Sequence, residues 1–229
     1  MTINRILNWD GCNNVRDLGG LNASNGYKTR WGAVVRGDHP AKLTADGWSV
    51  LYEHGVRTII SLRTHGLDEK DYLEVNPPYS DIEMVVVETE DVTDKEFREQ
   101  WASSELWCTP LYYRDALKRW PERHVDVIKA IAQAKPGGVL FHCKRGYDRT
   151  GIIALLILAL AGVSLEDIAA DYELSVDPVR EELLAGQHTT TRETILATLA
   201  SLDVEDYLRS GGLSQTELDT ISARFLEAG

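Results

Sequence analysis

Cysteine is scarce in this sequence, with three residues among 229: Cys12, Cys108 and Cys143. Three cysteines are too few to build a disulfide scaffold, which excludes the disulfide-rich class of small secreted domains. Free thiols persist in reducing compartments, so the sequence predicts a cytoplasmic protein. A reduced sulfur is also the form of cysteine that can act as a nucleophile.

Positive charge is in short supply as well. Lysine and arginine number 24 against 36 aspartate and glutamate residues, which gives a formal net charge of −12 and a pI near 4.9. Such a surface repels the phosphates of nucleic acids and of anionic membranes, so neither is expected as a partner. An anionic ligand would have to be captured locally by a few basic groups, against the overall field.

Long apolar runs are missing too. The strongest run, residues 152–163, is shorter than the roughly 20 residues that a bilayer crossing needs, so no integral membrane segment is expected. The six histidines show no metal-ligand spacing, and neither a metal nor another cofactor is predicted. Without linker, repeat or low-complexity tract, residues 1–229 are expected to form a single domain, and the sequence leaves its oligomeric state open.

The hydrophobic pattern predicts an α/β fold with a central, mostly parallel sheet flanked by helices and a helix-rich C-terminal third. Thr44 can cap a helix over residues 45–54 that Gly55 ends. The expected strands are residues 5–9, 32–36, 56–62, 82–87 and 138–141. The other expected helices are residues 123–134, 152–160, 164–175, 178–186, 191–200, 203–209 and 214–228.

One ten-residue stretch carries the functional signal: His142-Cys143-Lys144-Arg145-Gly146-Tyr147-Asp148-Arg149-Thr150-Gly151. An apolar strand precedes it and an apolar helix follows, which places the loop at the carboxyl end of a sheet strand, where open α/β sheets bind ligands. The loop runs into a helix N-terminus, whose N–H groups and dipole favour an anion. A structural cysteine beside a surface arginine is the alternative, and the two basic side chains after the cysteine disfavour it.

Each residue of this stretch has an expected role in handling phosphate. Cys143 is favoured as a thiolate there and is the expected nucleophile, forming a cysteinyl-phosphate that water hydrolyses. Arg149 offers a planar fork of donors that matches two phosphate oxygens. Thr150 can place its hydroxyl near the sulfur. The residues expected to bind substrate are Lys144, Arg145, Gly146, Tyr147 and Gly151.

This loop resembles the signature of cysteine-dependent protein tyrosine phosphatases, and more narrowly that of a bacterial group related to dual-specificity and phosphoinositide phosphatases. Other segments resemble the same group: Asn14 to Gly20, Ile59 to Arg63, Asp171 to Ser175 and residues 207–214 with the final helix. The resemblance covers nearly the whole chain. It implies a tyrosine-phosphatase-like fold and a phosphorylated protein substrate, with phosphotyrosine favoured and phosphoserine or phosphothreonine also possible.

Two positions bear on the alternative substrates. Many members of the resembling group have lysine where this chain has Tyr147, which counts against phosphoinositide hydrolysis, whereas Lys144 counts in its favour. A phosphatase for phosphoinositides or small phosphates is therefore the alternative. A non-catalytic phosphate-binding module is a further, less favoured alternative. Tyr147 could stack on a substrate ring or be a partly exposed aromatic at the rim of the loop.

The general acid that protonates the leaving group has three candidates. Asp148 lies in the loop, and in the resembling group this position has been interpreted as the acid; its alternative role is to hold Arg149. Glu122 follows Trp-Pro, yet it also fits the first turn of a helix. Acids within residues 88–94 are the third choice. Residues 91–107 are expected to be helical, either as a lid over the site or, preferably, packed on the core.

Further polar residues have open roles. Arg16 and Asp17 could line the pocket or pair with each other to fix the N-terminal loop, and the structural role is favoured. Arg63 could reach phosphate or form a surface ion pair. His142 could orient the loop through a hydrogen bond. Cys12 could protect an oxidised Cys143 as a disulfide partner.

Overall fold

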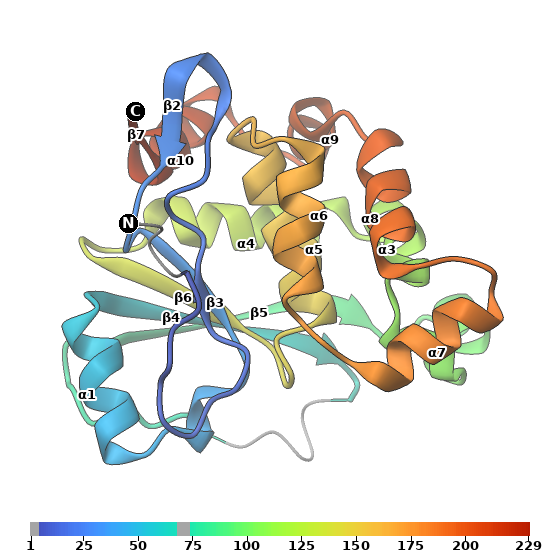
Figure 1. Ribbon diagram of the computed structural model, residues 1–229, viewed down its shortest axis with the longest axis horizontal. Coiled ribbons are helices and arrows are strands. Elements are labelled where there is room, and N and C mark those ends of the chain that lie inside the picture. Colours follow the sequence, from blue (N-terminus) through green and yellow to red (C-terminus); the bar gives the residue numbers. More distant parts are fainter. Residues whose placement is uncertain (1–4, 68–73) are drawn as a thin grey trace.

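The computed structural model describes residues 5–67 and 74–229, and a five-stranded sheet in the order β1-β3-β6-β4-β5 forms its centre (Figure 1). β3, β6, β4 and β5 pair in parallel, and the short β1 is antiparallel to β3 at one edge. The strands are β1 (Arg16–Asp17), β3 (Val34–Gly37), β4 (Val56–His65), β5 (Glu83–Asp91) and β6 (Gly138–His142). The mostly parallel sheet is confirmed.

Helices make up most of the remaining described chain, and α1 lies on one side of the sheet whereas α4, α5 and α6 lie on the other (Figure 1). The first five helices are α1 (Ala45–Glu53), α2 (Lys95–Phe97), α3 (Tyr113–Arg119), α4 (Pro121–Gln133) and α5 (Asp148–Leu160). The C-terminal part holds α6 (Leu165–Glu173), α7 (Pro178–Gly186), α8 (Thr191–Ala200), α9 (Val204–Ser210) and α10 (Gln215–Phe225). The helix-rich C-terminal third is therefore confirmed.

The sheet separates two hydrophobic cores, because successive side chains of a strand point to opposite faces. In β6, Val139 and Phe141 belong to the larger core with α4 and α5. Leu140, between them, packs in the smaller core with Trp48 and Leu51 of α1. β6 is buried on both faces, and this holds its carboxyl end in the middle of the sheet.

One strand prediction and one helix prediction were wrong in their extent. Residues 5–9 form a single bridge, Ile6 to Arg16, and no strand. Their apolar pattern reflects burial, since Trp9 packs in the core beside α1.

The final helix ends at Phe225, and the chain does not continue it. Residues Leu226–Ala228 form β7 instead, which pairs with β2 (Tyr27–Thr29). The predicted cap at Thr44 is confirmed, because its hydroxyl accepts a hydrogen bond from the Gly47 N–H at 3.2 Å.

The segment between β5 and α3 is helical only in short pieces. It contains α2, the π-helical turn η3 (Arg98–Ala102), and the 3₁₀ turns η4 (Glu105–Cys108) and η5 (Pro110–Tyr112). Phe97 is completely buried, and the Trp101 indole donates to Asp115 at 3.0 Å. The preferred interpretation, packing on the core, is therefore confirmed for this segment.

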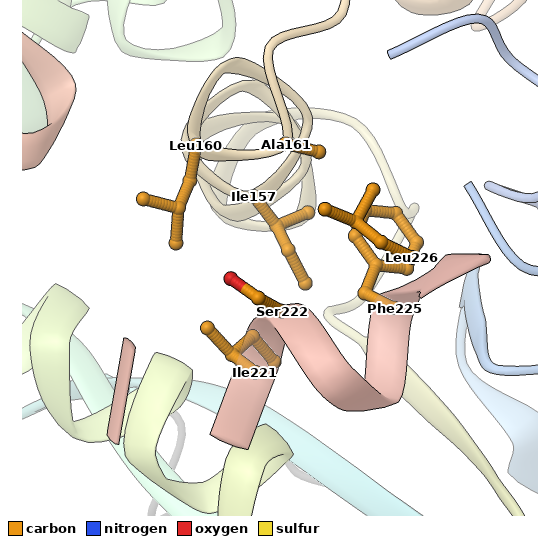
Figure 2. Close-up of a pocket in the computed structure, with 7 residues that line it drawn as sticks. All are labelled: Ile157, Leu160, Ala161, Ile221, Ser222, Phe225 and Leu226. Atoms are coloured by element: carbon orange, nitrogen blue, oxygen red, sulfur yellow. The ribbon is translucent and has the colours of Figure 1, made fainter. Parts of the chain in front are cut away.

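α5 and α10 meet at an apolar notch lined by Ile157, Leu160, Ala161, Ile221, Ser222, Phe225 and Leu226 (Figure 2). Its volume of about 10 Å³ is close to the space of a single water molecule, so the notch is a packing defect and not a ligand site. No helix among the described residues combines the length and apolar character needed to cross a bilayer.

Candidate active site

The phosphate-binding stretch has the predicted strand-loop-helix geometry. β6 ends at His142, residues 143–147 form the loop, and α5 begins at Asp148. β6 lies between β3 and β4, so the loop emerges at the carboxyl end of a central strand. The first-turn N–H groups of α5 therefore face the same place as the loop, which favours a bound anion.

A pocket of about 170 Å³ opens above this loop. Five of the predicted site residues line it: Cys143, Lys144, Arg145, Asp148 and Arg149. The other wall residues come from distant segments: Leu67, Glu90, Trp107, Cys108 and Tyr112. Of these, Glu90 belongs to the predicted range of candidate acids, residues 88–94, and the other four were not predicted to line the site. Cys143 is only 3% exposed, so the sulfur lies at the closed end of the pocket, whereas Lys144 and Arg145 are exposed at its mouth.

Gly146 and Thr150 do not line the pocket. Gly146 has φ +72°, and a Cβ there would lie 2.6 Å from the Gly37 carbonyl oxygen, so only glycine fits this approach of loop to β3. Thr150 is fully buried, and its Oγ1 has no hydrogen-bond partner among the described residues. That hydroxyl is therefore not engaged by another described group, which is compatible with its predicted role near the Cys143 sulfur.

Tyr147 and Gly151 do not fit their predicted substrate contacts. The Tyr147 hydroxyl donates to the Val176 carbonyl at 2.9 Å, and the Arg145 and Arg180 guanidinium groups each lie 5.2 Å from its ring. Tyr147 is thus a half-buried aromatic whose hydroxyl is held by Val176. Gly151 lies in the first turn of α5 and faces other protein side chains instead of the pocket.

Two carboxyl groups share the pocket. Burial raises the pKa of Asp148, and the positive charges of Arg180, Arg145 and Arg149 act in the opposite direction. Burial likewise raises the pKa of Glu90, against the charge of Arg149 and a hydrogen bond from the Tyr112 hydroxyl at 2.6 Å. Both groups therefore hold a proton at a higher pH than an exposed carboxyl would, as a general acid needs.

The other acid candidates lie elsewhere. Glu122 is in the first turn of α4 and does not line the pocket. Burial raises the pKa of Tyr207, and the charge of Glu122 adds to this effect. Of the described acids in residues 88–94, Glu90 alone lines the pocket. Both Glu90 oxygens already accept hydroxyl groups, from Tyr112 and from Thr64 at 3.1 Å. Asp148 is thus the carboxyl with the freer second oxygen.

A buried ionic network that the sequence did not reveal holds the loop from behind. The Asn14 amide donates to the carbonyls of Arg145 and Gly146, each at 3.1 Å, and Arg36 donates to the Gly146 carbonyl at 2.9 Å. Arg36 is itself bound to Asp171 at 3.2 Å. Because the loop carbonyls are bound on this outer side, its N–H groups are left for the pocket.

Arg16 and Asp17 are structural, but they do not pair with each other. Arg16 donates to Asp171 Oδ1 at 3.2 Å and to Asn14 Oδ1 at 2.7 Å. Asp17 accepts the Gly19 N–H at 2.7 Å and lies 2.7 Å from His54 Nε2. The predicted fixing of the N-terminal segment is confirmed with different partners.

His142 has the expected orienting contact, with Nδ1 donating to the Cys143 carbonyl at 3.2 Å. Burial lowers its pKa to about 3, so the imidazole is neutral. Neither Arg63 nor Cys12 is among the residues that line the pocket. The Cys12 thiol contacts the His39 carbonyl at 3.7 Å, and burial raises its pKa to about 12. The second sulfur of the pocket is that of Cys108.

This combination of a parallel α/β sheet and a cysteine-arginine loop defines a class of enzyme, the cysteine-based phosphatases. A model of the tyrosine phosphatase family matches residues 7–227 of the chain. The protein belongs to that family and is a phosphatase, with a phosphorylated substrate.

Two relatives in sequence are also named as tyrosine-protein phosphatases. A protein of Cupriavidus necator named as a tyrosine-protein phosphatase is 27% identical over 224 residues, which are 97% of this chain and 76% of the relative. A tyrosine-protein phosphatase of Nostoc commune is 34% identical over 134 residues, 45% of this chain and 44% of that protein.

Two solved structures are similar in fold. P. aeruginosa TpbA in complex with phosphotyrosine has a TM-score of 0.47 and 13% identity, covering 86% of this chain and 98% of that one. The catalytic core of Siw14 has a TM-score of 0.46 and 14% identity, covering 83% of this chain and 92% of that one.

Proposed function

We propose that the protein hydrolyses phosphotyrosine in protein substrates through a cysteinyl-phosphate on Cys143, with phosphoserine and phosphothreonine as further substrates. The observation that carries the proposal is that Cys143, Arg149 and Asp148 line one pocket at the junction of β6 and α5. Residues 1–229 act as one catalytic domain in this proposal. The free Cys143 thiol fits a reducing compartment such as the cytoplasm.

The first chemical step transfers the phosphoryl group to sulfur. The Cys143 thiolate attacks phosphorus, and the bond to the leaving oxygen breaks with its electron pair on that oxygen. Asp148 donates its proton to this oxygen, so the leaving group departs as a neutral alcohol or phenol. Arg149 and the loop N–H groups bind the three equatorial oxygens, whose charge must be stabilised in the transition state.

The second step regenerates the enzyme. Water attacks the phosphorus of the cysteinyl-phosphate, and the Asp148 carboxylate accepts the proton that the water loses. The sulfur–phosphorus bond breaks and its electron pair returns to Cys143 as the thiolate. The Thr150 hydroxyl, which lacks another partner among the described residues, stabilises that sulfur as it leaves.

The walls of the pocket support an aryl phosphate as substrate. Trp107, Tyr112 and Leu67 supply aromatic and apolar surface around the sulfur. A phenyl ring gains from burial against such walls, whereas the short side chain of phosphoserine does not reach along them. Phosphotyrosine is therefore favoured over the alkyl esters.

A second candidate is a phosphatase for phosphoinositides or small soluble phosphates. Lys144 and Arg145 are exposed at the mouth of the pocket and could bind additional phosphate groups of such a ligand. The net charge of −12 opposes approach to an anionic membrane. A non-catalytic phosphate-binding module is disfavoured because Cys143, Arg149 and Thr150 are all present.

The decisive experiment measures phosphate release from phosphotyrosine, phosphoserine and phosphothreonine peptides and from phosphoinositide vesicles, in the presence of a chelator. We expect the highest kcat/KM with phosphotyrosine peptides. Higher kcat/KM with the vesicles would replace the proposal by the second candidate. Phosphate binding with no release from any substrate would favour the binding module.

We also predict that Asp148→Asn reduces kcat in proportion to the basicity of the leaving group. Phenyl phosphate hydrolysis should fall about 10²-fold or more, because an amide cannot protonate the departing oxygen. Release of 4-nitrophenolate, which needs no proton, should fall much less. Equal losses on both substrates would instead assign Asp148 the role of holding Arg149.

A further inference from the structure

Asp148 is the end of a buried hydrogen-bond chain that joins four helices, α5, α3, α6 and α7. The Tyr113 hydroxyl, at the start of α3, donates to Asp148 Oδ1 at 3.4 Å. It also contacts the Tyr172 hydroxyl of α6 at 2.7 Å. Arg180 of α7 then donates from Nη1 to the Tyr172 hydroxyl at 3.4 Å. Tyr113, Tyr172 and Arg180 are each at most 1% exposed, so water does not compete for these contacts.

The acceptor at one end of the chain sets its direction. The single hydroxyl hydrogen of Tyr113 is donated to Asp148 Oδ1, so the Tyr113 oxygen accepts the hydrogen of the Tyr172 hydroxyl. A guanidinium group has donors only, so the Tyr172 oxygen also accepts from Arg180. Hydrogen bonds aligned in this way polarise and strengthen one another.

The direction decides which oxygen of Asp148 carries the acidic proton. Oδ1 accepts a hydrogen bond from Tyr113, so protonation falls on Oδ2. The two outer contacts of the chain are long and the central one is short, which makes the tyrosine pair the fixed unit. Contacts of this kind tighten as charge develops on the carboxyl group during the reaction.

Gly151 makes the space for the tyrosine pair. A Cβ at this position would lie 2.6 Å from Tyr172 Cε2 and 2.8 Å from the Tyr113 hydroxyl oxygen. Both distances are shorter than any ordinary van der Waals contact, so a larger residue would displace one of the two tyrosines. Gly151 thus leaves room for the two tyrosines and does not contact the pocket.

We propose that Tyr113 is a positioning residue for the general acid, aligned through Tyr172 by Arg180 and given room by Gly151. The inference rests on the proposed function in one respect, that Asp148 is the acid. It explains why this carboxyl group, and not Glu90, presents an unoccupied oxygen: Glu90 has a hydroxyl on each oxygen, whereas the chain occupies Oδ1 of Asp148 alone.

The groups that face Asp148 set the direction of the expected pH effect. Arg180 from α7, Arg145 from the loop and Arg149 from α5 favour its ionised form, and the Tyr113 hydroxyl from α3 does so by donating to it. Glu90 of β5, the other acid of the pocket, acts the other way. Further titratable groups nearby are Cys143, Lys144 and Cys108, which line the same pocket, together with Tyr112 and Tyr172. Removing the Tyr113 hydroxyl therefore raises the pKa of Asp148.

Tyr113→Phe tests the proposal, with Asp148→Asn measured beside it. We expect kcat for phenyl phosphate to fall about tenfold and kcat for 4-nitrophenyl phosphate less than about twofold, since only the first substrate needs a well-aligned proton donor. The alkaline limb of the kcat profile for phenyl phosphate should move to higher pH. Tyr172→Phe and Gly151→Ala should change the same quantities in the same direction by smaller factors.

Tyr207→Phe is the matched control, because its hydroxyl contacts His124 at 2.8 Å and lies outside the pocket lining. It should leave both substrates and the pH profile unchanged. If Tyr113→Phe and Tyr172→Phe lower kcat equally for both substrates and leave the alkaline limb in place, the tyrosines are structural and the proposal is overturned. If Asp148→Asn itself lacks a leaving-group dependence, the acid assignment fails and the positioning role falls with it.

Discussion

Cys143→Ser should abolish phosphate release from every substrate that the protein hydrolyses, with a loss of roughly 10⁴-fold or more. A serine hydroxyl at its ordinary pKa is a far weaker nucleophile than a thiolate. Cys108, the other sulfur of the pocket, lies outside the loop, and burial raises the pKa of its thiol, so it does not take over the role of Cys143. Arg149 and the loop N–H groups are unchanged in this variant, so the pocket should still bind inorganic phosphate. Phosphate release measures the loss of turnover, and calorimetric titration with inorganic phosphate measures the retained binding.

The matched control is Cys12→Ser, which removes a sulfur that does not line the pocket. It should keep its activity and its phosphate affinity. Retained turnover in Cys143→Ser would exclude the covalent scheme. Loss of both turnover and phosphate binding would mean that the substitution disrupts the loop, and acid quenching with radiolabelled substrate would then have to test for a phosphorylated Cys143 in the wild-type protein.

The phosphate loop could be predicted because all of its determinants are local. Apolar residues before and after the loop fix the strand and the helix, and the chemistry-bearing residues lie within ten consecutive positions. The helix cap at Thr44 could be predicted for the same reason, since a cap depends on contacts within one turn. Such features require no knowledge of how distant segments meet.

The residues around the loop were not predictable for the opposite reason. Arg16 and Asp171 are 155 positions apart, and Tyr113 and Tyr172 are 59 apart, so only the tertiary fold brings each pair together. Trp107 and Cys108 reach the pocket through short 3₁₀ turns that have no periodic pattern. The sequence analysis identified Asp171 only as part of a segment that resembles the phosphatase group, and it did not predict the arginines that bind this carboxylate.

Asp171→Asn should be the most destabilising of the conservative substitutions considered. Asp171 is 1% exposed and binds three guanidinium groups, those of Arg5 at 2.7 Å and of Arg16 and Arg36 at 3.2 Å. An amide removes the only negative charge of this cluster and leaves the arginines buried together, which typically costs about 3–5 kcal/mol. The free energy of unfolding from urea titrations at pH 7 should fall by that amount.

The pH dependence of this difference gives a sharper test. Burial would raise the pKa of Asp171, but the charges of Arg16, Arg36 and Arg5 prevail and hold it at about 2. The unfolded chain has an ordinary aspartate pKa of about 3.9. A carboxyl with a lowered folded-state pKa stabilises the protein fully above the unfolded value and progressively less as the pH falls toward 2. The gap between wild type and Asp171→Asn should therefore be constant above about pH 5 and narrow below about pH 4.

The same substitution should also weaken catalysis, since Arg36 connects Asp171 to the Gly146 carbonyl of the loop. A control on the exposed surface, Asp206→Asn in α9, should change the free energy of unfolding by less than about 0.5 kcal/mol. If Asp171→Asn were as stable as this control and its gap to wild type did not change with pH, the arginine cluster would hold the loop through its hydrogen bonds alone, and the charge of Asp171 would contribute nothing to the site.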